Sequence, residues 1–538
     1  MRNALVGTLA FLLLALAFPM TAAAYDPVEK PLAQLEADLV AGRATSVQLV
    51  QAYEARIARL NPELRAVIVV NPRAMAEAQA ADAARAAGAP QGPLAGVPIL
   101  IKDNIETADP MPTTAGSLAL KDNQNDRDAP LVARLRAAGA IILGKTNLSE
   151  WANIRSSRSI SGWSAIGGQA RNPYALDRSP CGSSAGSGVA AAASLAAAAI
   201  GTETDGSVTC PAAVNGLVGL KPTVGLVSRT HVVPISHSQD TAGPMTRDVR
   251  DAALLLGVIA GADAADPATA EADARKADYL AALKPEALSG VRVGVMRFAA
   301  NFHPETERVF NQALARLSAA GAVLVEIDKS PYDPGLSKLE RIVLMSELKA
   351  DLNVYLASTA PGRVPTRTLA DLIAFNKSHA ADEMPLFGQD AFEAAEQTLG
   401  LADPAYLAAK ADAHRLAGPE GIDAVLKAND VAVLVAPTLG PAWLIDPVLK
   451  DRSLGGGAGG PPAIAGYPHL TVPMGQVDGL PVGLSFIGPS WSEARLLAYG
   501  YAFEQAAQAR VPPALKPTAE IASKADWLAA APPPGKAP

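Results

Sequence analysis

The chain has 538 residues, of which 49% are hydrophobic and 18% are charged, so it holds ample apolar material for a large packed core. A formal net charge of −7 without basic clusters argues against a nucleic-acid partner. Two cysteines exclude a disulfide scaffold in so long a chain, and six histidines without an H-E-x-x-H motif argue against a zinc site.

Residues 1–24 have the pattern of a secretory signal peptide. Arg2 is the only charge before Asp26, an apolar run spans 4–18, and three alanines end at Ala24. Cleavage near Ala24 would give a secreted or periplasmic protein without membrane contact. The alternative is an uncleaved anchor helix, but the apolar run is short for a membrane span.

Helices and strands alternate over the first half of the remaining chain, which predicts a central sheet covered by helices on both faces. Residues 186–200 are almost entirely small and apolar, and their length favours a buried core helix over a membrane span. The other expected elements are two helices within 31–60, helices at 73–87, 131–138 and from Ser149, and strands at 67–70, 97–101 and 140–143.

The second half continues this alternation around a long region, about 334–428, that is expected to be mainly helical. Residues 262–276 are expected to form a surface connection, 454–462 a Gly/Pro-rich loop, and 531–538 a disordered tail. Because no compositional break divides the chain, we expect one large α/β domain over about 25–530. The remaining expected elements are strands at 291–295, 322–327, 431–436, 470–473 and 482–487, and helices at 305–319 and 492–508.

Three polar, glycine-containing segments interrupt the core pattern, and the first contains a lysine. Lys102 directly follows the apolar strand expected at 97–101. A lysine in such a position is desolvated, which lowers its pKa and suits it to act as a base. The alternative interpretation is a lysine that leaves the sheet and enters water.

The second segment, residues 179–187, holds paired serines at the expected start of a small-residue helix. Gly182 to Gly186 fit the G-x-S-x-G pattern of an esterase nucleophile elbow centred on Ser184. That motif needs a strand immediately before it, whereas residues 172–178 are typical of a loop. The alternative is an ordinary capped helix start.

The third segment, residues 201–211, places Gly206 beside Ser207 on a loop leaving the core. Consecutive backbone N–H groups on such a loop can receive an oxyanion while the hydroxyl attacks. The alternative is a polar turn. A serine nucleophile also needs a base, and His231, His237 and His469 are candidates, but none carries a recognisable motif, which favours structural or surface roles.

Taken together, the three segments resemble the amidase signature family, over residues 90–260 strongly and over 481–488 more weakly. The separation of the two serines, 207 − 183 = 24, is the one that family uses. The resemblance implies a mixed central sheet, Lys102 as catalytic lysine, Ser183 as a bridging serine after a cis peptide bond, and Ser207 as nucleophile. It also implies that Ser184 lies next to the catalytic residues without reacting itself. The oxyanion hole would consist of the backbone N–H groups of Thr204, Asp205, Gly206 and Ser207.

Many members of the family have two glycines where this chain has Asp205-Gly206 and Cys181-Gly182. In these two pairs the chain resembles the branch of the family that hydrolyses C-terminal peptide amides. This implies a small peptide or amide substrate, with no metal, no cofactor and no obligatory protein partner. Three alternatives stay open: an amidase for small aliphatic, aryl or fatty amides, a secreted esterase using Ser184 with a histidine, and a periplasmic binding protein. Whether Cys181 and Cys210 pair is also open.

Overall fold

The computed structural model describes residues 25–520, so the expected signal peptide and the expected disordered tail lie outside the described residues. Its main feature is an 11-stranded sheet in the order β1-β3-β2-β6-β8-β7-β12-β13-β11-β9-β10. The strands are β1 (Val67–Val70), β2 (Pro98–Lys102), β3 (Ile141–Thr146), β6 (Ala198–Glu203), β7 (Val218–Lys221), β8 (Thr241–Thr246), β9 (Arg292–Met296), β10 (Val323–Ile327), β11 (Val433–Pro437), β12 (His469–Val477) and β13 (Leu480–Ile487). A separate two-stranded sheet pairs β4 (Trp163–Ser164) with β5 (Gly168–Gln169).

The sheet is mixed, as expected. Strands β3, β2 and β6 run parallel near one end, and β11, β9 and β10 run parallel near the other. The strands between these groups pair antiparallel. In the β2–β6 pair Ile101 lies opposite Ile200, so the carboxyl ends of both strands, with Lys102 and Thr202, meet at one edge of the sheet.

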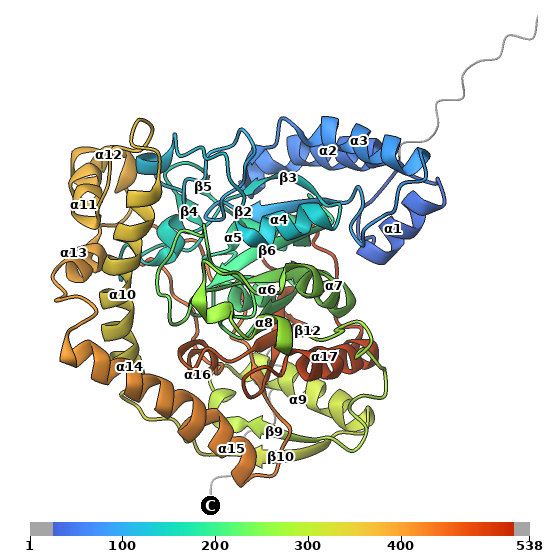
Figure 1. The fold of residues 1–538 in the computed structure, drawn as a ribbon. Coiled ribbons are helices and arrows are strands. Elements are labelled where there is room, and N and C mark those ends of the chain that lie inside the picture. The colour runs from blue at the N-terminus through green and yellow to red at the C-terminus, as the bar shows by residue number, and fades with distance from the viewer. Residues whose placement is uncertain (1–24, 521–538) are drawn as a thin grey trace, which may run out of the picture.

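Helices cover both faces of the sheet (Figure 1). Helices α4, α7, α17 and α9 contact one another in that order along one face, whereas α5 and α6 contact each other. The right-handed rule for parallel crossovers puts α4 (between β2 and β3) and α5 (between β3 and β6) on opposite faces. These and the N-terminal helices are α1 (Leu32–Val40), α2 (Ser46–Leu64), α3 (Ala74–Ala86), α4 (Pro130–Ala137), α5 (Ala185–Ala192), α6 (Thr209–Val214), α7 (Val249–Ile259), α8 (Ala272–Arg275), α9 (Pro304–Ala319), α16 (Gly460–Ile464) and α17 (Glu493–Ala507).

The predicted helical region between β10 and β11 is confirmed, and its helices form the yellow-to-orange arm of Figure 1. Its apolar core includes Leu352, Leu372 and Phe392, which join Trp151 from the main body in one buried cluster. The arm is thereby packed onto the segment that precedes the paired serines. It consists of α10 (Leu336–Ser358), α11 (Leu369–Ser378), α12 (Ala380–Glu383), α13 (Asp390–Glu396), α14 (Pro404–Ala417), a π-helical turn (Gly418–Asp423) and α15 (Ala424–Ala428).

The predictions of two helices are wrong. Residues 186–200 do not form one helix, because α5 ends at Ala192 and β6 begins at Ala198. A strand buried in the middle of a sheet and a buried helix both appear as continuous small apolar runs, so periodicity does not separate them. The helix expected from Ser149 is only a short 3-10 turn (Glu150–Asn153), within which Trp151 and Ala152 have positive φ.

Other differences are smaller. Strands β7 and β8 were missed, since glycine and proline at Gly219, Gly243 and Pro244 mask their strand pattern. The loop expected at 454–462 runs into α16, and the connection at 262–276 is largely exposed and contains α8. The remaining expected elements are confirmed within a residue or a few at their ends.

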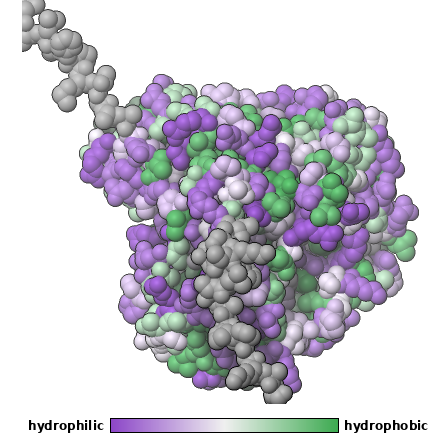
Figure 2. Space-filling view, turned by 180° about the vertical axis from the view of Figure 1, so that it is seen from behind, coloured by the Kyte–Doolittle hydropathy of each residue, from purple (hydrophilic) through white to green (hydrophobic). Residues whose placement is uncertain are grey.

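The surface is predominantly polar on the face shown in Figure 2, with smaller apolar groups between the polar residues. Over residues 25–520 no helix combines the length and hydrophobicity that crossing a membrane requires.

Candidate active site

Lys102 is the last residue of β2, and its side chain is fully buried. Its Nζ lies 2.8 Å from Ser183 Oγ and 2.8 Å from Thr202 Oγ1. Burial lowers the pKa of Lys102 to about 7, although the negative charges of Asp240 and Glu203 oppose this shift. The interpretation of Lys102 as a lysine that leaves the sheet for water is therefore wrong, and near neutral pH a large fraction of this amine is uncharged.

Ser183 lies in the turn that precedes α5, and the Gly182–Ser183 peptide bond is cis, as the resemblance implies. The Ser183 carbonyl accepts a hydrogen bond from the Ser149 N–H at 3.0 Å. A Cβ atom at position 182 would come 2.1 Å from Ser149 Oγ, so only glycine fits beside Ser183. Sequence and packing thus hold Ser183 Oγ against Lys102.

Ser184 is buried and bonds to backbone groups. Its Oγ donates to the Thr202 carbonyl at 3.0 Å and accepts from the Thr202 N–H at 3.2 Å, which ties the start of α5 to β6. No strand precedes it within residues 172–182, so the local structure lacks the strand that an esterase elbow needs.

Ser207 lies on the loop between β6 and α6 and is 7% exposed. Gly206 has φ +76°, a conformation that favours glycine, and the Glu203 carboxylate accepts the N–H groups of Val208 (2.7 Å) and Thr209 (2.9 Å). The Ser207 carbonyl accepts the Ser184 N–H at 3.1 Å, so the two serine loops touch. In the described part of the chain no hydrogen bond joins Ser207 Oγ to Ser183 Oγ.

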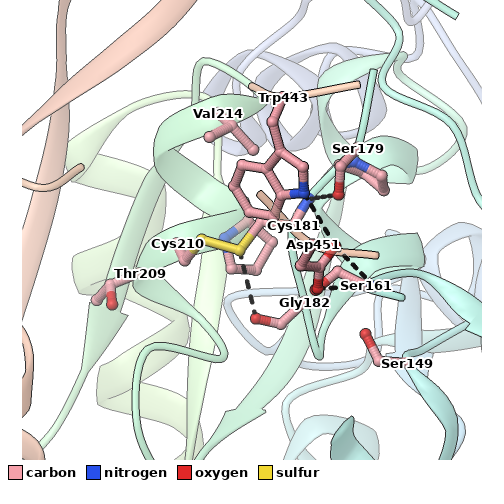
Figure 3. Close-up of a disulfide and its surroundings, with 12 residues drawn as sticks. Ser149, Ser161, Ser179, Cys181, Gly182, Thr209, Cys210, Val214, Trp443 and Asp451 are labelled. Atoms are coloured by element: carbon pink, nitrogen blue, oxygen red, sulfur yellow. Dashed lines mark hydrogen bonds between the residues drawn. A yellow bond between two sulfur atoms is a disulfide. The ribbon is translucent and has the colours of Figure 1, made fainter. Parts of the chain in front are cut away.

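A disulfide joins the segment before Ser183 to the first turn of α6, which follows Ser207. Cys181 and Cys210 pair across 29 residues of sequence, which answers the question that the sequence left open. The bridge packs in a small apolar cluster with Val214 and Trp443, and Trp443 Nε1 donates to the Asp451 carboxylate at 2.9 Å (Figure 3). One cysteine thus lies two residues before Ser183 and the other three residues after Ser207.

The three histidines considered as bases have other partners. His469 Nε2 lies 2.6 Å from Ser485 Oγ, inside the sheet. His237 Nδ1 lies 2.9 Å from an Asp351 oxygen, which raises the pKa of His237. His231 lies beside the Glu106 carboxylate, 3.9 Å away. Within residues 25–520 no hydrogen bond connects any of them to Ser183, Ser184 or Ser207, so structural roles are favoured for all three.

One side-chain cluster has ligand types suited to a metal. His237, Glu347 and Asp351 bring ligand atoms within 4.8 Å of one another. Lys410 Nζ already lies 3.1 Å from both His237 Nε2 and a Glu347 oxygen, so an ammonium group supplies the positive charge there.

A cavity of about 620 Å³ opens beside the Ser207 loop and is lined by Asp205. Apolar and aromatic groups form much of its wall, and Glu340 at the start of the helical region and the glycine-rich residues 456–458 complete it. The aromatic residues of this wall, Phe298, Phe302 and Tyr332, carry no motif by which the sequence could have marked them.

The family model named Amidase matches residues 48–497 of this chain. The chain belongs to the amidase signature family. The native peptide amidase of Stenotrophomonas maltophilia is 54% identical, superposes with a TM-score of 0.87, and the match covers 91% of this chain and 99% of that one. An amidase family protein from Bacillus anthracis is 33% identical with a TM-score of 0.81, over 90% of this chain and 92% of that chain.

Among curated relatives, a glutamyl-tRNA(Gln) amidotransferase subunit of Roseiflexus castenholzii is 38% identical over 88% of this chain and 95% of its own length. The family also confirms the expected α/β fold. The protein is therefore an amidase, a hydrolase that cleaves amide C–N bonds, and not the binding protein considered from the sequence.

Proposed function

We propose that this amidase hydrolyses C-terminal peptide amides to the free acid and ammonia, with Ser207 as nucleophile and Lys102 and Ser183 as its proton relay. The observation that carries the proposal is the contact of 2.8 Å between Lys102 Nζ and Ser183 Oγ at a site where burial lowers the lysine pKa to about 7. The likeness to the Stenotrophomonas maltophilia peptide amidase supports the choice of substrate.

In the proposed reaction, neutral Lys102 accepts the proton of Ser183 Oγ while Ser183 accepts the proton of Ser207 Oγ. The Ser207 oxygen forms a bond to the amide carbon, and the carbonyl electron pair moves to the oxygen. The N–H groups of residues 204–207 would hold that oxyanion, and each such donor is typically worth about 3 kcal/mol.

The proton then returns through Ser183 to the amide nitrogen, the C–N bond breaks, and ammonia leaves. Water adds to the acyl carbon, with its proton taken up by the same relay, and the acid is released as Ser207 regains its hydrogen. No metal or cofactor enters these steps.

The cavity lined by Asp205 suits a short peptide as substrate. Its volume of about 620 Å³ lies in the range of small-molecule sites, and its aromatic wall would bury apolar side chains of the peptide. A structure of the related peptide amidase with the competitive inhibitor chymostatin supports a site that accepts peptide-like molecules.

We also propose a secreted or periplasmic location. The pattern of residues 1–24 supports it, and so does the Cys181–Cys210 disulfide, because such bonds persist mainly in oxidising compartments. Mass spectrometry of the protein from its natural host would test this. A mature chain starting near Tyr25 in the exported fraction is expected, and an intact N-terminus in the cytosol would contradict it.

The substrate is tested by ammonia release from matched amides. Peptides with C-terminal amides are compared with small aliphatic and aryl amides, and Ser207→Ala serves as control for background hydrolysis. We expect the highest kcat/KM with the peptide amides and the free peptide acid as the second product. Preference for the small amides would overturn the substrate proposal and favour an amidase of the same chemistry for those compounds.

A further inference from the structure

Thr204, the first residue of the loop that carries Ser207, is held by two consecutive side chains from another part of the chain. Thr204 Oγ1 donates to the Asp240 carboxylate at 2.6 Å. The Thr204 carbonyl accepts from Gln239 Nε2 at 3.4 Å. Both holding residues lie just before β8, more than 30 residues beyond Ser207 in the sequence.

The contact with Gln239 sets the orientation of the Asp205 N–H as well as that of the Thr204 carbonyl. The Thr204–Asp205 peptide bond is trans and planar, so the Thr204 carbonyl and the Asp205 N–H point in opposite directions. When Gln239 holds the carbonyl on one side, it directs the Asp205 N–H to the other. That N–H is one of the four donors proposed to receive the oxyanion.

Asp240 is itself rigidly placed. Its second carboxylate oxygen accepts the N–H groups of Ile235 at 2.8 Å and Ser236 at 2.9 Å. Together with the Thr204 hydroxyl, three donors fix this carboxylate, and the positive charge of Arg229 acts on it as well. A carboxylate held in this way is a firm anchor for the Thr204 side chain.

The segment 236–239 is in turn attached to α10 of the helical region. Three carboxylates spaced along that helix accept its donors, and each bond comes from a successive residue of the segment. The bonds are Gln239 Nε2 to Glu340 (2.9 Å), Ser238 Oγ to Glu347 (2.6 Å) and the His237 N–H to Asp351 (2.9 Å).

We propose that Gln239 and Asp240 are positioning residues that orient the backbone donors of the oxyanion loop and connect this loop to the helical region. The inference rests on the proposed function, because it takes the N–H groups of Thr204 and Asp205 as oxyanion donors. Neither side chain needs to touch the substrate, since both act through Thr204.

Two substitutions of Thr204 test the Asp240 contact. Thr204→Val removes Oγ1 but keeps the side-chain shape, whereas Thr204→Ser keeps Oγ1. We expect Thr204→Val to lower kcat about tenfold or more with KM changed less than about twofold, because the oxyanion forms only in the transition state. Thr204→Ser should lose much less of kcat than Thr204→Val, a difference that a general packing defect would not reproduce.

Gln239→Leu tests the carbonyl contact, with Ser238→Ala as matched control. Ser238→Ala removes a hydrogen bond of the same segment to α10 without touching Thr204. We expect Gln239→Leu to lower kcat with KM retained, and Ser238→Ala to keep both. Equal losses in the two variants, or none in Gln239→Leu, would overturn the role of Gln239.

A peptide aldehyde gives a readout that does not depend on turnover. The Ser207 O–H adds across the aldehyde C=O to form a hemiacetal, whose oxygen occupies the oxyanion position, whereas the peptide acid product forms no such bond. Thr204→Val and Gln239→Leu should weaken the aldehyde at least about fivefold and the acid less than about twofold. Equal weakening of both probes would contradict positioning of the oxyanion donors.

The pH dependence of kcat/KM distinguishes the effect of Asp240 from that of Gln239. Asp240 and Glu203 both face Lys102 and raise its pKa, so Asp240→Asn should shift the acidic limb of kcat/KM to lower pH. Gln239→Leu removes no charge and should leave that limb in place. All comparisons use a peptide with a C-terminal amide. A wild type that does not hydrolyse it would overturn the proposed function, whereas variants that behave like an active wild type would overturn this inference.

Discussion

Lys102 Nζ lies 2.8 Å from Ser183 Oγ, although 81 residues separate them in the sequence. The contact forms because β2 and β6 are neighbouring parallel strands, and the turn before α5, which contains Ser183, lies at their carboxyl ends. Burial of both residues removes the water that would otherwise keep the amine protonated. The proposed chemistry depends on this desolvated contact.

The first prediction concerns the pH dependence of activity. Since the pKa of Lys102 lies at about 7 and the base must be neutral, kcat/KM should rise about tenfold per pH unit below 7 and level off above it. Initial rates of ammonia release across this range measure the limb. A limb that is still rising above pH 9 would indicate a lysine near its ordinary pKa of 10.5 and contradict the account.

The same pKa predicts how stability depends on pH. Because the pKa of Lys102 is lower in the folded protein than in the unfolded chain, the unfolded chain binds more protons between about pH 7 and 10.5. The free energy of unfolding therefore rises with pH over this range, and burial of Lys102 lowers it most at pH 7 and below. Lys102→Met should therefore raise the free energy of unfolding by more at pH 6 than at pH 9, with a difference of the order of 1 kcal/mol or more. Denaturant titration at both pH values measures it, and equal effects would mean that Lys102 is not desolvated.

The two neighbouring serine candidates should respond differently to substitution. Ser207→Ala should abolish acyl-enzyme formation and lower kcat by at least about a thousandfold, as loss of a nucleophile does. Ser184→Ala loses only hydrogen bonds to the Thr202 backbone, so it should keep substantial turnover while lowering stability by about 1 kcal/mol. Steady-state kinetics and thermal melting check both variants, and the reverse ranking of activity would favour an esterase centred on Ser184.

Removal of the disulfide should destabilise the protein. The bridge closes a loop of 29 residues, for which the entropy of the unfolded chain predicts a loss of about 3 to 4 kcal/mol. A thiol-free reductant should lower the melting temperature of the wild type. The double variant Cys181→Ser/Cys210→Ser is the control, since it should already melt at the lower temperature and should not respond to the reductant. A wild type that melts unchanged after confirmed reduction would refute the prediction.

Much of the candidate site could be predicted because its residues interrupt the hydrophobic pattern of the sequence locally. Lys102 after an apolar strand, Ser183 among glycines and Gly206 before Ser207 each break a core pattern, and the structure brings the first two into contact. The alternation of apolar and polar segments likewise predicted the α/β fold.

Features that depend on distant segments could not be predicted in this way. The boundary between α5 and β6 is hidden in an alanine-rich run that suits both a helix and a strand. The Cys181–Cys210 pairing depends on Cα atoms that come within 6.0 Å only in the folded chain. Gln239 and Asp240 carry no motif, and their contacts to Thr204 exist only because the segment before β8 returns to the Ser207 loop.

The proposed roles of Ser207 and Lys102 are tested most directly by identifying the residue that becomes covalently modified. The protein is treated with a fluorophosphonate, digested, and mapped by mass spectrometry, with the Lys102→Ala variant treated in parallel. We expect an adduct on Ser207 in the wild type and strongly slowed labelling in Lys102→Ala. An adduct on Ser184, or labelling of Ser207 at the wild-type rate without Lys102, would contradict it.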